Sequence, residues 1–224
     1  MIWCENHLFI FFIFYVLKNT TECPAGLYSN EIGAVASSAC IGCPEGRYSS
    51  ATGLTSPAEC NNCAAGKKNP NVGSNSSESC QDCNSGWYQD LPSSSTCIEC
   101  PSGSYATNKG SIVCIECAPG TYADSFGTVS CRKCDPDSYQ PNFNATKCIA
   151  VQEGYYQSGS TTKVECPAGK SGRGGHATCQ DCWEGTFQSK AGQTTCDDCP
   201  NGWGNSGNGS TGCNAVPPGS YTLN

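Results

Sequence analysis

Cysteine is the residue type with the most chemical potential in this chain, which has 21 of them among 224 residues. From Cys23 to Cys213 they recur mostly as C-x-x-C, a spacing that serves zinc binding, thiol–disulfide exchange and structural cross-linking. A zinc array needs cysteines in fours, whereas this series starts and stops with single cysteines and lacks those expected at Val151 and Lys163. A redox C-x-x-C begins a helix in a βαβ unit, and no amphipathic helical pattern occurs here. Disulfide cross-linking is the favoured use, and an intracellular zinc array stays the remote alternative.

Other catalytic chemistry has few residues to work with. The two histidines are His7 and His176, and the second lies in SGRGGHAT, a glycine-rich stretch without the preceding strand and following helix of a phosphate loop. We interpret residues 171–175 as a hairpin tip. The 19 acidic and 12 basic residues are spread thinly, with neither a basic stripe for nucleic acid nor an acidic cluster for calcium. The sequence predicts no enzyme, no metal site, no cofactor and no nucleic-acid partner.

Apolar residues are too few for a sizeable core. Leu, Ile, Val and Phe number 30, and ten of them lie in the first 17 positions. Residues 8–17 form an unbroken apolar run of signal-peptide length, so we expect a cleaved signal over residues 1–22. An incorrectly assigned start codon or a short buried segment is the alternative. Cleavage would remove Cys4 and leave 20 cysteines, an even number that suits complete pairing.

A repeat begins at each opening cysteine and continues as P-x-G-x-Y, with a period of 20 residues at first and mostly 17 later. Eleven complete repeats fill residues 23–215, and residues 216–224 begin a twelfth that is cut short. This truncation favours a longer natural chain, with a possible membrane anchor outside the sequence. Numbered in order, repeats 1 to 12 open at Cys23, Cys43, Cys63, Cys83, Cys100, Cys117, Cys134, Val151, Cys166, Cys182, Cys199 and Val216.

The two missing cysteines discriminate between pairing schemes, because both losses fall in repeat 8. If each opening cysteine pairs with the next cysteine along, the two losses would have been partners and nothing is stranded. Pairing within each C-x-x-C instead leaves Cys23, Cys148, Cys166 and Cys213 without neighbours. The favoured bonds are Cys23–Cys40, Cys43–Cys60, Cys63–Cys80, Cys83–Cys97, Cys100–Cys114, Cys117–Cys131, Cys134–Cys148, Cys166–Cys179, Cys182–Cys196 and Cys199–Cys213.

The residues between the cysteines predict a short two-stranded hairpin in each repeat. The glycine three positions after the opening cysteine should have a positive φ, since its one replacement in a complete repeat is Asp137, a residue type that tolerates that region. The tyrosine two positions later should cover a disulfide. We expect small disulfide-rich repeats with little regular secondary structure, stacked into an elongated rod in which each unit contacts only its neighbours.

The strings CPAGLY, CPEGRY, CPSGSY, CAPGTY and VPPGSY resemble the ephrin-receptor-like cysteine-rich repeats, within the wider growth-factor-receptor and TNF-receptor-like class. The resemblance covers residues 23–224, with departures at Val151, Lys163 and Val216 and weak units at Cys63 and Cys166. It implies an extracellular module of receptor ectodomains and of large surface proteins, where tandem arrays act as stalks or recognition surfaces.

We therefore expect a non-enzymatic chain, secreted or on the extracellular face of the plasma membrane, that acts as a spacer, adhesion element or receptor-type ectodomain. Its partner would be an extracellular protein or glycan. The alternative from another class is a structural coat protein without a dedicated ligand. Four N-glycosylation sequons, at Asn19, Asn75, Asn144 and Asn208, suit secretion, and the last three lie in the polar stretch before a closing cysteine.

Overall fold

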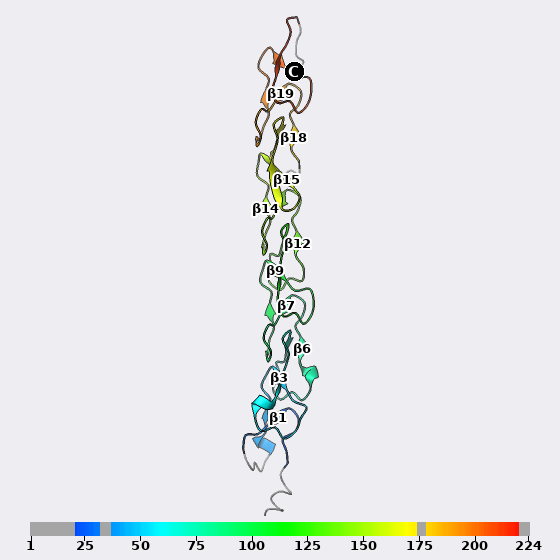
Figure 1. Cartoon of the computed structure of the whole chain (residues 1–224), viewed down its shortest axis with the longest axis vertical. Helices are drawn as coiled ribbons and strands as arrows, with labels where there is room; N and C mark the ends of the chain where they lie inside the picture. The colour runs from blue at the N-terminus through cyan, green and yellow to red at the C-terminus, as the bar shows by residue number, and fades with distance from the viewer. Residues whose placement is uncertain (1–20, 32–36, 174–177, 220–224) are drawn as a thin grey trace, which may run out of the picture. The chain divides into compact units, whose positions relative to one another are not determined.

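The computed structural model of the chain, drawn in Figure 1, describes residues 21–31, 37–173 and 178–219. The apolar run expected to be a signal peptide, with Cys4, His7 and the sequon at Asn19, lies outside the described residues, and so does His176. The signal peptide therefore stays a prediction.

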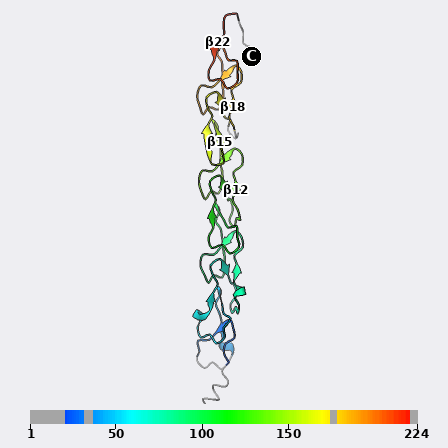
Figure 2. The same ribbon diagram turned by 45° about the vertical axis from the view of Figure 1, so that its right-hand side comes forward.

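Short antiparallel hairpins are the recurring element of the described chain. Eleven two-stranded sheets each join two consecutive strands, and ten of these sheets have strands of only two residues. The exception is β15–β16, whose four-residue strands appear as longer arrows in Figures 1 and 2. In chain order the pairs are β1 (Leu27–Tyr28) with β2 (Ile41–Gly42), β3 (Arg47–Tyr48) with β4 (Asn61–Asn62), β5 (Lys67–Lys68) with β6 (Gln81–Asp82), β7 (Trp87–Tyr88) with β8 (Ile98–Glu99), β9 (Ser104–Tyr105) with β10 (Ile115–Glu116), β11 (Thr121–Tyr122) with β12 (Arg132–Lys133), β13 (Ser138–Tyr139) with β14 (Ile149–Ala150), β15 (Tyr155–Ser158) with β16 (Thr162–Glu165), β17 (Lys170–Ser171) with β18 (Gln180–Asp181), β19 (Thr186–Phe187) with β20 (Asp197–Asp198), and β21 (Trp203–Gly204) with β22 (Asn214–Ala215).

A tight turn after the opening cysteine starts each hairpin. In repeat 1 the Leu27 N–H donates to the Pro24 carbonyl, and Gly26 between them has a φ of +85°. That geometry requires a residue that tolerates the left-handed region. The prediction for Asp137 is confirmed, because it occupies the same turn position in repeat 7 with a φ of +74°.

Loop length separates the first three repeats from the later ones. Their paired cysteines are 17 residues apart, against 13 or 14 in the later disulfide-closed repeats whose bonds are described. The extra residues form a single turn of 3-10 helix just before the closing cysteine: η1 (Ser37–Ala39), η2 (Pro57–Glu59) and η3 (Ser77–Ser79). In η2 and η3 the hydroxyls of Ser56 and Ser76 accept an N–H of the first turn, as N-caps do.

Cysteine is the commonest residue type in the buried interior of the described chain. Cys43, Cys83, Cys100, Cys117, Cys166 and Cys182 have no exposed surface, and the largest fully buried side chain is the polar Asn69. The described chain has one cluster that resembles a hydrophobic core, formed by Cys43, Leu54 and Cys60 with Tyr28 packed against it. Small disulfide-rich repeats, the predicted fold class, are therefore what the structure contains.

The chain divides into two compact units, residues 1–99 with 106–114 and residues 100–105 with 115–224. Within each unit, successive repeats dock on one another, and every junction described below lies within one unit. The predicted elongated rod stays a prediction.

Candidate functional site

Nine described disulfides each join an opening cysteine to the next cysteine along the chain. Their Cα–Cα distances are 5.5 to 5.9 Å, an ordinary span for this bond. Cys100 and Cys114 are disulfide-bonded as well. A sulfur in a disulfide is not the thiolate that binds zinc or starts thiol exchange. The bonded pairs are Cys23–Cys40, Cys43–Cys60, Cys63–Cys80, Cys83–Cys97, Cys117–Cys131, Cys134–Cys148, Cys166–Cys179, Cys182–Cys196 and Cys199–Cys213.

Three backbone hydrogen bonds join repeat 2 to repeat 3. The turn-glycine N–H of Gly46 donates to the Asn69 carbonyl (2.7 Å), and the Ser49 N–H donates to the Ser74 carbonyl (3.0 Å). In the reverse direction, the Gly73 N–H donates to the carbonyl of the opening Cys43 (2.8 Å). These donors and acceptors are backbone groups, so the junction tolerates many side chains.

The same three bonds recur along both units. All three are present between repeats 3 and 4, 4 and 5, 6 and 7, and 9 and 10. In the third bond, the N–H of the residue ten positions after an opening cysteine donates to the carbonyl of the opening cysteine of the preceding repeat. The pairs, donor first, are Gly53 to Cys23, Gly73 to Cys43, Ser93 to Cys63, Gly110 to Cys83, Gly127 to Cys100, Asn144 to Cys117, Gly192 to Cys166 and Gly209 to Cys182.

Contacts also reach the next repeat but one, which corrects the expectation that each unit contacts only its neighbours. A Cβ added to Gly66 of repeat 3 would overlap the carbonyl oxygen of Gly110 in repeat 5. The turn glycine is therefore needed for space as well as for its φ. A Cβ would overlap a backbone carbonyl in the same way at Gly26 (with Gly73), Gly46 (Ser93), Gly103 (Asn144), Gly154 (Gly192) and Gly169 (Gly209). At Gly120 it would overlap the side chain of Ser160.

A second left-handed position, ten residues after the opening cysteine, was missed in the sequence. It is occupied by glycine in most repeats, but by Ser93 (φ +59°) and Asn144 (φ +56°) in repeats 4 and 7. This residue provides both the third junction bond and the contact with the next repeat but one. The signal that could have revealed it is the regular glycine before the closing cysteine, which its replacement by serine and asparagine obscures.

Buried polar side chains directly after the aromatic residue were also missed. Gln89 is 5% exposed, and its amide donates to the Thr96 carbonyl (2.8 Å) and accepts from the Leu91 N–H (3.2 Å). Gln140 and Gln188 repeat this arrangement in repeats 7 and 10. Each amide side chain thereby fixes the shape of its own loop, a role that explains a polar residue at a buried position.

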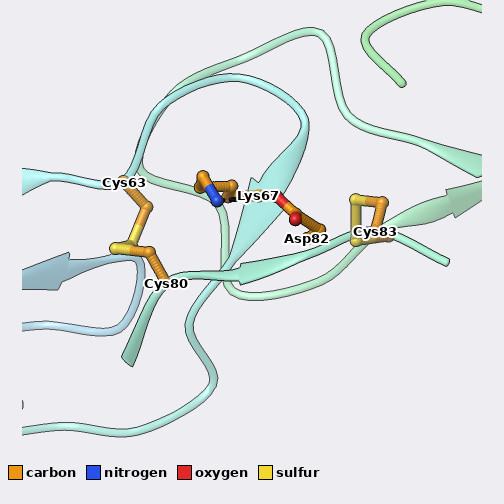
Figure 3. A network of polar contacts seen from close by, with 6 residues as sticks. Cys63, Lys67, Cys80, Asp82 and Cys83 are labelled. Atoms are coloured by element: carbon orange, nitrogen blue, oxygen red, sulfur yellow. Dashed lines mark hydrogen bonds and ion pairs between the residues drawn. A yellow bond between two sulfur atoms is a disulfide. The ribbon is translucent and has the colours of Figure 1, made fainter. Parts of the chain in front are cut away.

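Charged side chains pair across two of the hairpins at the same place. In Figure 3, Lys67 of β5 and Asp82 of β6 lie close together between the Cys63–Cys80 disulfide and Cys83, with their nitrogen and oxygen 2.6 Å apart. Lys170 of β17 and Asp181 of β18 form the equivalent pair at 2.8 Å. Both pairs are partly exposed, so each contributes little to stability.

Comparison with known protein families identifies the repeats. The family described as tyrosine-protein kinase ephrin type A/B receptor-like matches in four segments, three overlapping (residues 72–113, 86–130 and 103–146) and one separate (169–215), which together span more than half of the chain. This chain belongs to that ephrin-receptor-like family. A search of the curated proteins found no match.

Family membership agrees with the disulfides in indicating an extracellular cysteine-rich domain. The ephrin-receptor-like repeat belongs to a receptor-like family and not to a family of enzymes. In the part of the chain that the structure describes, no helix has the length and apolar character to span a membrane. No group of three or more potential metal-binding side chains was found among the same residues.

Repeat 8 departs most from the ephrin-receptor-like pattern, because polar contacts occupy the place of the disulfide. Val151 is buried (4% exposed) where the opening cysteine is expected. The ammonium of Lys163 lies 4.1 Å from the ring centroid of Tyr155 and donates to the side-chain carbonyl of Gln152 (2.6 Å). The Tyr155 hydroxyl donates to a carboxylate oxygen of Glu165 (3.2 Å). This bond and the negative charge of Glu165 raise the pKa of Tyr155 above its ordinary value.

The tyrosine prediction can be followed in repeat 1. Tyr28 packs on the cluster that contains Cys43 and Cys60, so the disulfide that it covers belongs to repeat 2. Its strand also contacts repeat 2, since Tyr28 forms a parallel bridge with Leu54. The ring therefore contributes to docking between repeats.

The three predicted glycosylation asparagines that the structure describes are exposed. Asn75 and Asn208 lie in loops before a closing cysteine. Asn144 has a scaffold role in addition, because its N–H makes a junction bond to Cys117. The glycine-rich segment is not simply a hairpin tip, which corrects that interpretation: Ser171 lies in β17, and the Gly172 N–H bonds to the Gln193 carbonyl of repeat 10.

Proposed function

We propose that this chain is a non-enzymatic spacer and binding region outside the cell, either secreted or on the extracellular face of the plasma membrane. The observation that carries the proposal is the junction of three backbone bonds, which repeats in both units. A junction that depends on backbone groups holds one repeat to the next whatever side chains face outward. The outward side chains are thus free to vary for recognition.

Exposed apolar side chains support a binding role for the outer surface. Trp183 is 73% exposed, and Phe126 and Phe143 are exposed to 66% and 63%. Large aromatic residues contribute strongly to protein interfaces, and exposed apolar surface often marks them. We propose an extracellular protein or glycan as the partner. A coat protein would use the same residues in contacts between copies of the chain.

Glycans at Asn75, Asn144 and Asn208 are part of the proposal, since all three side chains are exposed in loops. Removal of N-glycans by an amidase that converts the asparagine to aspartate should raise the mass of each site peptide by about one unit. Thr146→Ala removes the sequon at Asn144 without changing the junction residue. It should abolish that one conversion and leave the other two.

A spacer is tested by its length. The secreted chain is fused to a lipid anchor on a cell surface, and the height of an amino-terminal label above the membrane is measured by fluorescence energy transfer to a membrane dye. Deleting two, four or six repeats should lower the label in proportion. Matched chains in which flexible Gly/Ser linkers of equal length replace those repeats are the control, because the span of a flexible chain grows with the square root of its length and not in proportion to it. A height that is the same with repeats and with linkers would contradict the spacer role.

The coat alternative is distinguished by self-association. Analytical ultracentrifugation of the secreted chain should show monomers at micromolar concentration if the apolar side chains serve a separate partner. Concentration-dependent polymers would favour the coat. Free thiols together with bound zinc, in chain taken from cells under gentle lysis, would contradict both extracellular functions.

A further inference from the structure

Repeat 8 is the repeat in which the described chain continues without a covalent bridge. Seventeen residues, 149–165, separate Cys148 from Cys166, and none of them is a cysteine. In the nine repeats with a described bond, a disulfide holds the two ends of the loop 5.5 to 5.9 Å apart between Cα atoms. Tension applied along the chain passes through that bond, and the loop residues carry no load. In repeat 8 the tension passes through hydrogen bonds instead.

The direction of loading makes the β15–β16 hairpin weak. Its four cross-strand pairs run from Tyr155–Glu165 at the open end to Ser158–Thr162 beside the turn. The chain enters at one strand of the open end and leaves at the other. Pulling the two ends apart therefore breaks the pairs one after another, starting at Tyr155–Glu165, and never loads all of them together.

The side-chain contacts that hold the open end together are polar and partly exposed. They are the Tyr155–Glu165 hydrogen bond, the Lys163 ammonium over the Tyr155 ring and the Lys163–Gln152 bond. Exposed interactions of this kind contribute little to stability, whereas a disulfide stays intact until it is reduced. Backbone bonds add to these contacts, since the Cys166 N–H donates to the Gly154 carbonyl (2.9 Å) at the open end. Bonds to neighbouring repeats come from the backbone of Val151, Gly154 and Ser160 and from the Gln157 side chain.

We propose that repeat 8 is an extension element: under tension it opens first and lengthens the chain without breaking a covalent bond, while the disulfide-closed repeats keep their length. The inference deepens the proposed spacer function and rests on it for its biological use. Eighteen Cα–Cα steps connect Cys148 to Cys166, so full opening provides a contour of about 60 Å less the folded distance between them.

The test is force spectroscopy on the oxidised secreted chain, pulled from its two ends. One reversible lengthening of at most about 60 Å should occur at a lower force than any other event. In the double variant Val151→Cys with Lys163→Cys, a new disulfide should form at the two positions where the repeat lacks its cysteines. The low-force event should then disappear and should return when a reductant is added. Val151→Ser with Lys163→Ser is the matched control, since serine cannot form the bond and the event should persist.

Two measurements keep the result decisive. A thiol count of zero and a peptide map with Cys134–Cys148 and Cys166–Cys179 intact show that the double-cysteine variant has folded and oxidised. Persistence of the low-force event in that variant would overturn the inference, and so would absence of the event from the unmodified chain. Both outcomes leave the spacer test untouched. Conversely, if the chain fails the spacer test but shows the low-force event, the extension element is supported and only its proposed biological use is contradicted.

Discussion

Gly66 and Gly185 occupy the same place in their repeats and have the same φ of +82°, but they differ in what surrounds them. A Cβ at Gly66 would overlap the carbonyl of Gly110, whereas a Cβ at Gly185 would meet no described atom within 4 Å. The two positions therefore separate the cost of the backbone conformation from the cost of lost space. Alanine in the left-handed region costs about 1 to 2 kcal/mol at either position.

Gly66→Ala should destabilise its junction more than Gly185→Ala, because the backbone of repeat 5 must move in addition. Local hydrogen–deuterium exchange measures the difference. Gly185→Ala should accelerate exchange around its turn by about 5- to 30-fold, and Gly66→Ala should exceed that and also accelerate exchange at Gly110. Equal effects of the two variants would show that the contact with the next repeat but one contributes nothing.

Gln89 allows a second comparison at this scale. Gln89→Ala leaves the Thr96 carbonyl and the Leu91 N–H without their partners, at a cost of about 1 to 3 kcal/mol. Faster exchange should be confined to the loop between Cys83 and Cys97. Gln81→Ala, at an exposed position in β6, is the matched control and should leave exchange unchanged. A similar effect of both variants would contradict the loop-shaping role of Gln89.

At the scale of the elements, the lengths of the strands and 3-10 helices depend more on the spacing of the cysteines than on the pattern of apolar and polar side chains. All the described strands except β15 and β16 are only two residues long, so a period of two could not have been detected in them. The turn glycine and the aromatic residue located the first strand correctly. The 3-10 helices of repeats 1 to 3 were not predicted, because three residues are too few to show a helical periodicity and only the added loop length indicated them.

The β15–β16 hairpin should respond to alkaline pH through Tyr155. Because Glu165 raises the pKa of Tyr155 in the folded chain, the hairpin keeps this stabilisation below the ordinary pKa of tyrosine and loses it as the pH rises through the raised value. Glu165→Gln removes the negative charge and should move the pKa of Tyr155 back toward its ordinary value. Absorbance titration near 295 nm measures this shift, and Tyr155→Phe identifies the signal. An unchanged titration in Glu165→Gln would contradict the assigned cause.

At the scale of the molecule, the sequence predicted the covalent framework because every described bond is local. Each joins cysteines no more than 17 residues apart, so counting and parity were sufficient. The junctions could not be predicted in the same way. They depend on backbone carbonyls, such as that of Gly110, which carry no side-chain signature apart from the glycine that makes room for them.

Reduction should remove the ordered structure of the whole chain. Closing a loop of about 15 residues stabilises the folded state by about 3 kcal/mol, and the scarce apolar residues cannot replace that contribution. Addition of a phosphine reductant should bring amide exchange throughout residues 23–215 to the rate of an unfolded chain, and reoxidation should restore protection. Protection that survives complete reduction would show that the junction hydrogen bonds suffice without the disulfides.

Each junction joins a repeat to repeats that follow it in the chain, and this order determines how the structure forms during synthesis. Repeat 3 can close its disulfide once Cys80 has been made, and repeat 4 then supplies its junction bonds. Its last contact, at Gly66, is complete when Gly110 has followed, 44 residues later. Among the described residues, no junction contact waits for a distant terminus, in contrast to a globular domain whose first and last strands pair. A growing chain would therefore carry an unfinished tail of about two repeats, whatever its final length.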